Sequence, residues 1–532
     1  MKRQIYFLWL FISLASHAQY KNLQSDKIDI KKYTFQISIN DENDLIKGIA
    51  KIDFNLLQPV DKLILNLKNK NFLNRGMLVS QVIDLKGTEL PYIHEKDSLI
   101  IQIPDSITSQ HVEIVYSGIP LDGLYIKNNL YGKRTFFGDN WPNRAQNWLP
   151  VIDHPSDKAL VEWIITAPKH YEVIASGRLT DKLNLNDNYI YLFKTQAPIA
   201  TKVMVMAAAD FQIKYPEILH LHDQCIPLSY WIYADAPLTA FDDFQNTPEI
   251  LKFYDSINGP YPYQKLANLQ SNTRFGGMEN AGNIFYDENK VNGLHKIENL
   301  VAHEIAHQWF GNSVTEKNWR DIWLSEGFAT YMTDLYLEHK YGRQRLIERM
   351  KMERDKVIGY NLFNPKPVVY DEKENLMKLL NPNSYEKGAW VLHMLRQKTG
   401  DSIFFDILHN YYEKYRDKNA STEDFIEVAE YTSDMDLQEF FNQWLYKAGV
   451  PEIKISHELI NKKILINIEQ INDSYELELP VLVRSGENQL KKILHITRKY
   501  QEFSLPLPKD FDTENLQIEF DPEAQVLFRL IR

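Results

Sequence analysis

The most informative stretch of this 532-residue chain reads Val-Ala-His-Glu-Ile-Ala-His over residues 301–307. Residues four apart share one face of a helix, so a helix here places His303 and His307 on the same side. Glu326 follows the second histidine after 18 intervening residues. Two histidines and one more distant carboxylate leave a zinc ion with an open coordination position, which is typical of catalytic rather than structural zinc sites.

The surroundings of these residues predict that they are buried. Apolar residues cover most of the predicted helix around His303, and Glu326 lies in the equally apolar run Ile-Trp-Leu-Ser-Glu-Gly-Phe-Ala, residues 322–329. Unpaired buried charge costs about several kcal/mol, so a carboxylate here needs a cationic partner, and a metal ion supplies one. This argument disfavours an interpretation as solvated surface residues.

A second segment, Gly-Gly-Met-Glu-Asn at residues 276–280, makes the interpretation more specific. Together with the residues 301–312 and Trp-Leu-Ser-Glu-Gly-Phe-Ala at 323–329, it resembles the M1 family of zinc aminopeptidases, which belong to the gluzincin class. The resemblance implies one Zn²⁺ per chain and a set of site residues. The implied zinc ligands are His303, His307 and Glu326, the implied general base is Glu304, and the implied substrate-binding residues are Gly276, Gly277, Met278, Glu279 and Asn280.

The resemblance also implies a reaction, hydrolysis of the N-terminal peptide bond of peptides that have a free N-terminus. Zinc lowers the pKa of a bound water, and Glu304 would take the proton as the water attacks the scissile carbonyl. Glu279 would pair with the free α-ammonium and so select the first peptide bond. Gly276 and Gly277 would leave a strand edge bare enough for the substrate backbone to pair with it.

A third match lies at Ser-Tyr-Glu-Lys-Gly-Ala-Trp, residues 384–390, which resembles the Tyr-x-Lys-Gly segment of the family. The implied role of Tyr385 is to donate its hydroxyl proton in a hydrogen bond to the oxyanion of the tetrahedral intermediate. Without the resemblance, a Tyr at a helix start is more often a packing residue. We therefore expect Glu304 and Tyr385 to be the catalytic residues.

The chain departs from the family at two positions. Where many members have Gln in a Gln-Ala-x-x-Ala-Arg segment that helps to bind the substrate amine, this chain has Trp141. Asn140, Asn143 and Gln146 are candidates to replace that contact. Ser325 also stands where many members have Asn, directly before the predicted ligand Glu326.

Three other functions remain open on the sequence. A non-catalytic peptide-binding scaffold would be expected to lose ligands or the base, and this chain retains all of them. An epoxide hydrolase activity layered on the aminopeptidase fold, as one branch of the family shows, needs a lipid-shaped pocket that has no local sequence signature. An endopeptidase of the thermolysin type would share the zinc site, but Glu279 favours a substrate held by its amine.

The N-terminus predicts export. Lys2 and Arg3 precede an apolar stretch over residues 5–14, and Ser16-His17-Ala18 supplies the small residues that a signal peptidase reads. We expect a signal peptide over residues 1–18, cleavage before Gln19, and a periplasmic or extracellular protein. An uncleaved N-terminal anchor is the competing interpretation, and we expect no integral membrane segment after cleavage.

The composition is that of a globular protein. Cys225 is the only cysteine, so no intrachain disulfide can form. The formal charge of −11 becomes −13 without Lys2 and Arg3, which argues against nucleic acid as a partner. The chain is long enough for two to four domains.

The hydrophobic pattern changes twice along the chain and predicts a multidomain α+β protein. Alternation over residues 19–211 predicts a β-rich N-terminal domain. Helical periodicity over residues 212–449 predicts a mainly α, thermolysin-like zinc catalytic domain. Alternation over residues 450–532 predicts a small β-sandwich. Predicted helices cover residues 296–312, 326–340, 385–398, 402–415 and 437–446. Ser421 with Asp424, and Asp436 with Glu439, are predicted helix starts.

Many family members continue into a large α-helical C-terminal domain that covers the active site. The chain ends at Arg532. From this length we expect no such domain and a more open cleft that admits longer peptides.

Overall fold

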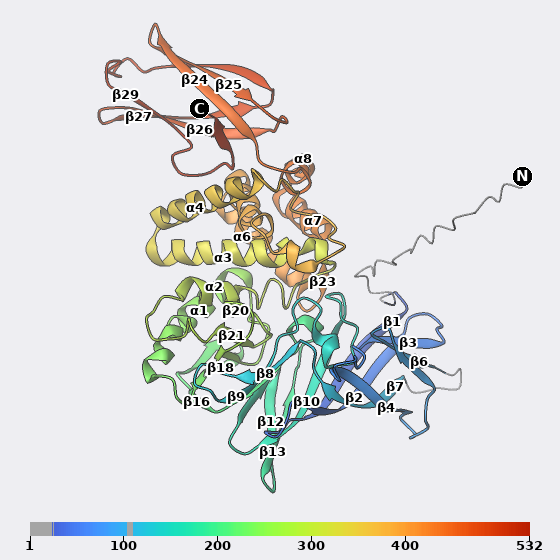
Figure 1. Ribbon diagram of the computed structural model, residues 1–532. Helices are drawn as coiled ribbons and strands as arrows, with labels where there is room; N and C mark the ends of the chain where they lie inside the picture. Colours follow the sequence, from blue (N-terminus) through green and yellow to red (C-terminus); the bar gives the residue numbers. More distant parts are fainter. Residues whose placement is uncertain (1–23, 25, 104–109, 532) are drawn as a thin grey trace, which may run out of the picture.

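The structure is a computed structural model that describes residue 24, residues 26–103 and residues 110–531. The predicted signal peptide, residues 1–18, lies outside the described residues. A β-rich N-terminal region, a central region of helices over a sheet, and a C-terminal β region follow one another from the bottom to the top of Figure 1. The predicted multidomain α+β fold is therefore confirmed.

Three sheets build the N-terminal region, and alternating residues such as Phe35 and Ile37 face its core as predicted. The eight-stranded sheet contains, in spatial order, β12 (Arg178–Leu185), β13 (Asn188–Lys194), β10 (Lys158–Pro168), β1 (Ile28–Ser38), β2 (Ile46–Leu56), β7 (His111–Ile119) and β4 (Gly76–Asp84), with β14 (Ile199–Ala200) beside β10. The four-stranded sheet contains β11 (Glu172–Ala175), β15 (Met206–Ala209), β9 (Arg134–Gly138) and β8 (Leu124–Asn128). The three-stranded sheet contains β3 (Lys62–Asn66), β6 (Ser98–Gln102) and β5 (Tyr92–Glu95).

The central region begins with a six-stranded sheet, which corrects the prediction of purely helical periodicity from residue 212 onwards. It contains β16 (Phe211–Lys214), β18 (Gln224–Tyr233), β19 (Leu266–Ser271), β21 (Asn283–Asp287) and β20 (Gly277–Met278), with β17 (Ile218–Leu221) also paired to β18. All six residues of β19 are buried, and β19 runs parallel to both of its neighbours. Strands that are buried on both faces show no alternation, so the period-two signal is missing.

Eight helices of the described residues form the rest of the central region, with a two-stranded pair of β22 (Thr315–Glu316) and β23 (Asn419–Ala420). They are α1 (Thr247–Asn258), α2 (Glu298–Ala306), α3 (Trp323–Tyr341), α4 (Arg343–Asn361), α5 (Gly388–Thr399), α6 (Asp401–Tyr415), α7 (Thr422–Ser433) and α8 (Gln438–Phe441). The predicted capping box of Ser421 and Asp424 is confirmed at the start of α7. The helix start predicted at Asp436 and Glu439 is shifted by one residue, because Leu437 is the N-cap of α8 and Asp436 accepts the backbone N–H of Gln438.

Two predicted helices differ from the observed ones at the site itself. α2 ends at Ala306 instead of 312, because Gly311 has a φ of 116° and the chain turns there into a bridge between Phe310 and Val314. The helix predicted from 385 starts as a π-helical turn, Asn383–Lys387, and becomes α5 at Gly388. Both irregular turns lie beside candidate site residues, where such departures are common.

The C-terminal β region consists of two sheets, as the alternating pattern predicts. One contains β28 (Tyr500–Pro506), β25 (Lys463–Gln470), β24 (Glu452–Ile460) and β30 (Arg529–Ile531), and the other β27 (Asn488–Ile496), β26 (Leu477–Ser485) and β29 (Leu516–Phe520). Alternate residues of both sheets, among them Ile466 and Val481, are buried in the core.

Buried polar contacts join the N-terminal region to the turn that follows α2. Lys202 and Glu316 form an ion pair at 2.6 Å with side chains 1% and 0% exposed. The Lys158 ammonium donates to the carbonyls of Asn312 and Ser313 at 3.0 and 2.6 Å. Breaking a buried ion pair by removing one partner costs about 3–5 kcal/mol, so these contacts hold the N-terminal loops in place against the central region.

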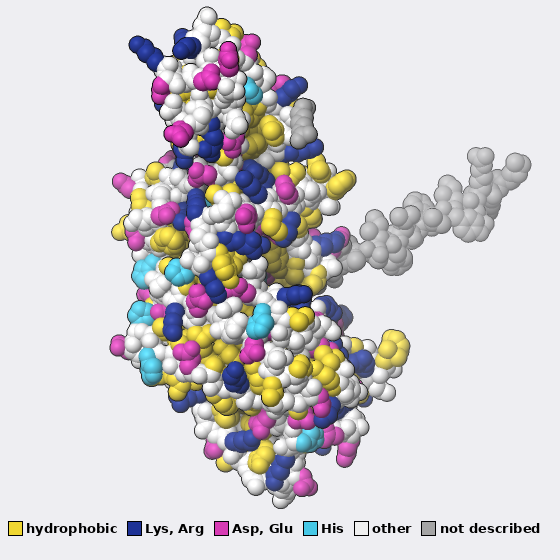
Figure 2. Space-filling view, turned by 90° about the vertical axis from the view of Figure 1, so that its left-hand side faces the viewer, with side chains coloured by type: hydrophobic (Ala, Val, Ile, Leu, Met, Phe, Trp, Pro, Cys, Tyr) yellow, Lys and Arg dark blue, Asp and Glu magenta, His cyan; other side chains and the backbone are white. Residues whose placement is uncertain are grey.

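The surface is mixed in charge. Acidic and basic side chains are interspersed over the face drawn in Figure 2. Among the described residues, no helix combines the length and the apolar character that crossing a membrane requires.

Candidate active site

The three predicted metal ligands converge in one buried cluster. His303 lies in α2, His307 directly follows it, and Glu326 lies in the first turn of α3. The two histidine Nε2 atoms are 3.1 Å apart, and Glu326 Oε2 lies 3.5 Å from His303 Nε2 and 3.3 Å from His307 Nε2. Ligand atoms about 2.0–2.1 Å from a tetrahedral zinc are about 3.3–3.4 Å from one another. The spacing of these three atoms therefore fits Zn²⁺.

The negative charge around the cluster also favours the binding of a cation. The carboxylates of Glu279, Glu304 and Glu326 line one cavity, and Glu279 and Glu304 each share a possible metal-ligating group with His307. Burial raises the pKa of Glu304 well above its usual range, and the charges of Glu279 and Glu326 raise it further. Burial alone would lower the pKa of His307, but the neighbouring carboxylates raise it to about 9. A bound cation compensates this excess of negative charge.

The turn after α2 fixes the orientation of His307. Its Nδ1 donates to the carbonyl of Phe310 at 3.1 Å and lies 3.1 Å from Ser325 Oγ, so its Nε2 is left to face the cluster. Gly311 allows this approach, because a Cβ there would lie 2.2 Å from Ser325 Oγ. Ser325 thus supports the ring of a predicted ligand.

Glu304 reaches the cavity only because residue 277 is glycine. A Cβ at Gly277 would lie 2.2 Å from Glu304 Oε1, so any other residue would displace the carboxylate. Gly277 and Met278 form β20, which pairs on one side with β21 and stands at the edge of the six-stranded sheet. The predicted base therefore lies beside an edge strand that has an unpaired side.

Glu279 follows β20 and is held by its backbone. Its carbonyl accepts hydrogen bonds from the side-chain amides of Gln308 at 2.9 Å and Asn312 at 2.6 Å, and Gln308 Oε1 accepts the N–H of Gly282. The Glu279 carboxylate lines the cavity, is 5% exposed, and its Oε1 has no hydrogen-bond partner among the described residues. Gln308 and Asn312 lie within the segment 301–312 that resembles the family, but the sequence predicts no role for them.

The predicted substrate-binding segment does not line the cavity throughout. Gly276, Gly277, Met278 and Glu279 do, but Asn280 does not, and its fully buried amide has no hydrogen-bond partner among the described residues. The structure therefore brings together four of these five residues.

Tyr385 faces the cavity from the π-helical turn before α5. Its ring stacks on His303, with centroids 6.0 Å apart and planes at 15°. Close packing of α3 on α5 makes this approach possible, because a Cβ at Gly327 would lie 2.9 Å from Gly388 Cα. Burial and the nearby carboxylates raise the pKa of Tyr385 well above its usual range, so the hydroxyl stays protonated and can donate.

Trp141 lines the cavity, and the three candidates to replace the family's amine contact do not. Asn140 is occupied elsewhere, since its Nδ2 donates to Thr201 O at 3.1 Å and its Oδ1 accepts from Trp148 Nε1 at 2.9 Å. Gln146 donates to the Asn143 carbonyl at 2.8 Å. The structure does not support that hypothesis, because none of the three lines the cavity, Asn140 bonds to the segment at Thr201, and Gln146 bonds within its own loop.

Several further residues of the cavity could not be found from local motifs. Phe275, Leu300 and Leu380 line it, and Trp319 packs behind Trp141 with ring centroids 5.9 Å apart. The cavity has a volume of about 230 Å³, below the range of about 300–1,000 Å³ of pockets for drug-sized ligands. It is therefore sized for one residue of a larger ligand.

The fold and the donor set resemble those of metallopeptidases of the HExxH class, with His303 in one helix, His307 directly after it, and Glu326 in the next helix. Sequence comparison then specifies the family. The description "Peptidase family M1 domain" matches residues 243–444, and "Peptidase M1 N-terminal domain" matches residues 30–203. The chain belongs to peptidase family M1.

Individual relatives are distant and mostly longer. Glutamyl aminopeptidase of Homo sapiens is 24% identical over 483 residues, which cover 84% of this chain and 50% of the relative. Probable aminopeptidase 2 of Sulfurisphaera tokodaii is 25% identical over 491 residues, which cover 88% of this chain and 58% of the relative. The chain thus spans about half the length of these curated relatives.

Solved structures match more of their own length. The M1 zinc metallopeptidase from Deinococcus radiodurans has a TM-score of 0.69 at 23% identity, covering 80% of this chain and 95% of that one. A mutant of that metallopeptidase bound to the substrate Tyr-Ser-Ala has a TM-score of 0.68 at 21% identity, with 79% and 94% covered. These likenesses show the shared fold.

Proposed function

We propose that this protein is a zinc-dependent aminopeptidase that hydrolyses the N-terminal peptide bond of peptides. The observation that carries the proposal is the Glu279 carboxylate, which shares one cavity with the metal cluster and has a buried oxygen without a hydrogen-bond partner in the part of the chain that the structure describes. A free α-ammonium supplies both the charge and the donors that this oxygen lacks. Pairing at Glu279 places the first peptide bond of the substrate beside the cluster.

The edge strand β20 orients the substrate backbone. Its outer side has unpaired backbone groups next to Glu304, and β-strand addition would satisfy them. Because Gly277 has no side chain, the substrate backbone can approach the Glu304 carboxylate. Glu279 and β20 together fix one end and the direction of the peptide.

The proposed general base is Glu304. As a carboxylate it would take a proton from the attacking water and pass it to the departing amine. A bound Zn²⁺ would lower the pKa of that water toward neutral and polarise the scissile carbonyl.

Tyr385 would stabilise the developing oxyanion. Its hydroxyl stays protonated over the ordinary pH range and lies on the His303 side of the cavity. Loss of one such donor in comparable sites costs about 10²–10³ in kcat. The retained base, anchor and donor argue against a non-catalytic scaffold.

The relatives support peptide substrates. The printed names include glutamyl aminopeptidase, and one solved neighbour holds the tripeptide Tyr-Ser-Ala. No observation favours the epoxide hydrolase alternative.

The test is turnover of fluorogenic amino-acid amides by the purified full-length protein. Activity is expected to disappear with a chelator, to return with Zn²⁺, and to be absent for the same substrates after N-acetylation. Chelator-resistant activity, or equal cleavage of free and acetylated substrates, would falsify the proposal.

We further propose that the enzyme acts outside the cytoplasm, on the support of the residues 1–18 alone. Mass spectrometry of the protein from its native cells should find Gln19 at the N-terminus. An intact Met1 on the mature protein would contradict cleavage.

A further inference from the structure

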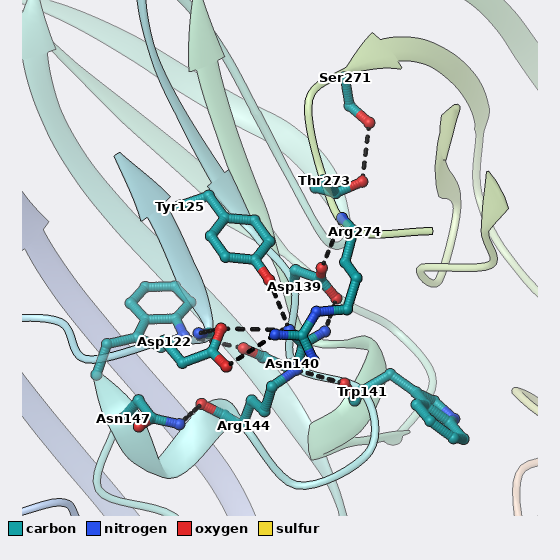
Figure 3. A network of polar contacts seen from close by, with 12 residues as sticks. Asp122, Tyr125, Asp139, Asn140, Trp141, Arg144, Asn147, Ser271, Thr273 and Arg274 are labelled. Carbon is teal, nitrogen blue, oxygen red and sulfur yellow. Dashed lines mark hydrogen bonds and ion pairs between the residues drawn. The ribbon is translucent and has the colours of Figure 1, made fainter. Parts of the chain in front are cut away.

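We infer that the site selects peptides whose first residue is large and apolar, and that Arg144 is the positioning residue that sets this preference. The inference rests on the proposed aminopeptidase function and names its substrate class. It is carried by the polar network around Arg144, shown in Figure 3, and by the apolar wall that this network holds.

The wall is defined by the apolar residues that line the cavity. They are Trp141, Phe275, Met278, Leu300 and Leu380. When the ammonium of a substrate pairs with Glu279 and its carbonyl lies at the metal cluster, the side chain on the same α-carbon must occupy the remaining space beside this wall. Burying an apolar side chain there is favourable in proportion to the area removed from water.

The charge of the cavity disfavours an acidic first residue. Among the described residues that line it there is no Lys or Arg, whereas Glu279, Glu304 and Glu326 contribute three carboxylates. A carboxylate on the substrate side chain would find no cationic partner among these lining residues and would be repelled by Glu279.

Arg144 is a buried cation behind the wall, and it is already engaged. Its Nε donates to the carbonyl of Trp141 at 2.6 Å, its Nη1 to Asp122 and to the Tyr125 hydroxyl, and its Nη2 to Asp139. Four of its five N–H donors thus have partners, and its side chain is 8% exposed. Two carboxylates neutralise its charge, so it cannot serve as a receptor for an acidic substrate.

The network ties together two loops that are far apart in sequence. On one side Arg144 holds the backbone of Trp141. On the other side Asp139 accepts the backbone N–H of Arg274 at 3.3 Å, and the guanidinium lies 5.8 Å from the centroid of the Phe275 ring. In Figure 3 the indole of Trp141 points away from the network. Arg144 therefore fixes the backbone of Trp141, while the indole ring of Trp141 lines the cavity.

The two rings meet as a consequence. Trp141 and Phe275 pack edge to face at 5.8 Å, with planes at 88°, although 133 positions separate them in the sequence. Without the cation, the buried carboxylate of Asp139 would lose its partner and both loops would be free to shift. We expect such a change to displace the residues of the wall and to leave the geometry of the metal cluster unchanged.

The first experiment compares kcat/KM of the zinc-loaded wild-type protein for Leu, Phe, Ala and Glu amides of one fluorophore. Leu and Phe are expected to exceed Ala by about tenfold or more, since each added methylene in an apolar pocket contributes a factor of about 10–200. The kcat/KM for the Glu amide is expected to be at least about a hundredfold lower than that for the Leu amide. A kcat/KM for the Glu amide equal to or above that for the Leu amide would overturn the inference.

The second experiment tests Arg144 through the variant Arg144→Met. The ratio of kcat/KM for Leu over Ala is expected to fall about tenfold, mainly through a higher KM for Leu, while kcat for Ala stays within about threefold. The matched control is Arg134→Met, because Arg134 also lies over a ring, that of Phe136, and pairs with a carboxylate, that of Asp44, away from the cavity. The ratio of kcat/KM for Leu over Ala should not change in the Arg134→Met protein.

Phe275→Ala covers the case in which Arg144→Met does not fold, because Phe275 is only half-buried and lines the cavity directly. It should lower the same ratio with unchanged zinc content. An unchanged ratio in a folded Arg144→Met or Phe275→Ala protein would contradict the inference. Wild-type protein that cleaves no free-amine substrate would instead contradict the proposed function.

Discussion

The two halves of the active-site cavity are built in different ways. The metal half takes His303 and His307 from one helix and its end, and Glu326 from the next helix, so short sequence intervals determine its geometry. The first-residue half takes Trp141 from the N-terminal region and Phe275 from the central region, and a polar network joins them. The metal half depends on local helix geometry, whereas the first-residue half depends on how two regions pack.

This difference predicts two kinds of mutational effect. Changes in the metal half should lower turnover of every substrate by a similar factor, because they act on the chemical step. Changes in the first-residue half should alter the ranking of substrates and leave the metal bound. Substrate panels measured together with zinc content separate the two kinds.

The largest effect is expected for Glu304→Gln. Gln keeps the shape of the side chain beside Gly277 but cannot accept the proton, so kcat should fall by about 10³–10⁴ for all first residues. Zinc content, measured by atomic emission, should remain at one per chain. A loss of zinc would show that Glu304 is a ligand, as the alternative group of Glu279, Glu304 and His307 would allow.

Tyr385→Phe should have the next largest effect. It removes the hydroxyl but keeps the ring that stacks on His303, so kcat should fall by about 10²–10³ with little change in KM. A variant with kcat near that of the wild type would exclude Tyr385 as the oxyanion donor.

Ser325→Ala should have the smallest effect. The hydroxyl contacts His307 Nδ1, but the Phe310 carbonyl still accepts from that nitrogen, so the ring keeps one of two supports. Zinc affinity, measured by chelator competition, should weaken by about tenfold and kcat should change less than threefold. A complete loss of zinc would mean that the serine, rather than the backbone, orients the ring.

The metal half could be predicted from the sequence, and the reason is physical. Helical spacing alone places His303 beside His307, and the apolar residues around Glu326 indicate burial. The resemblance to family M1 added roles for Glu279 and Tyr385, and the structure places both in the same cavity as the histidines.

The first-residue half could not be predicted in the same way. Trp141 was visible as a departure from the family, but its contact with Phe275 depends on packing between regions, which leaves no periodic signal. The amides of Asn140 and Gln146 were plausible donors by chemistry, and only the fold shows that Asn140 bonds to the distant Thr201 and Gln146 to the nearby Asn143. The buried strand β19 was missed for a related reason, since residues buried on both faces do not alternate.

The central claim is that Glu279 anchors the free amine of the substrate, and one measurement tests it most directly. This is the ratio of kcat/KM for a free peptide over its N-acetylated form, compared between the wild type and Glu279→Ala, with Glu249→Ala on the exposed surface of α1 as control. We predict a ratio of about 10³ or more for wild type and control, and a ratio within about tenfold of unity for Glu279→Ala with zinc retained. A ratio that stays high in Glu279→Ala would contradict the account.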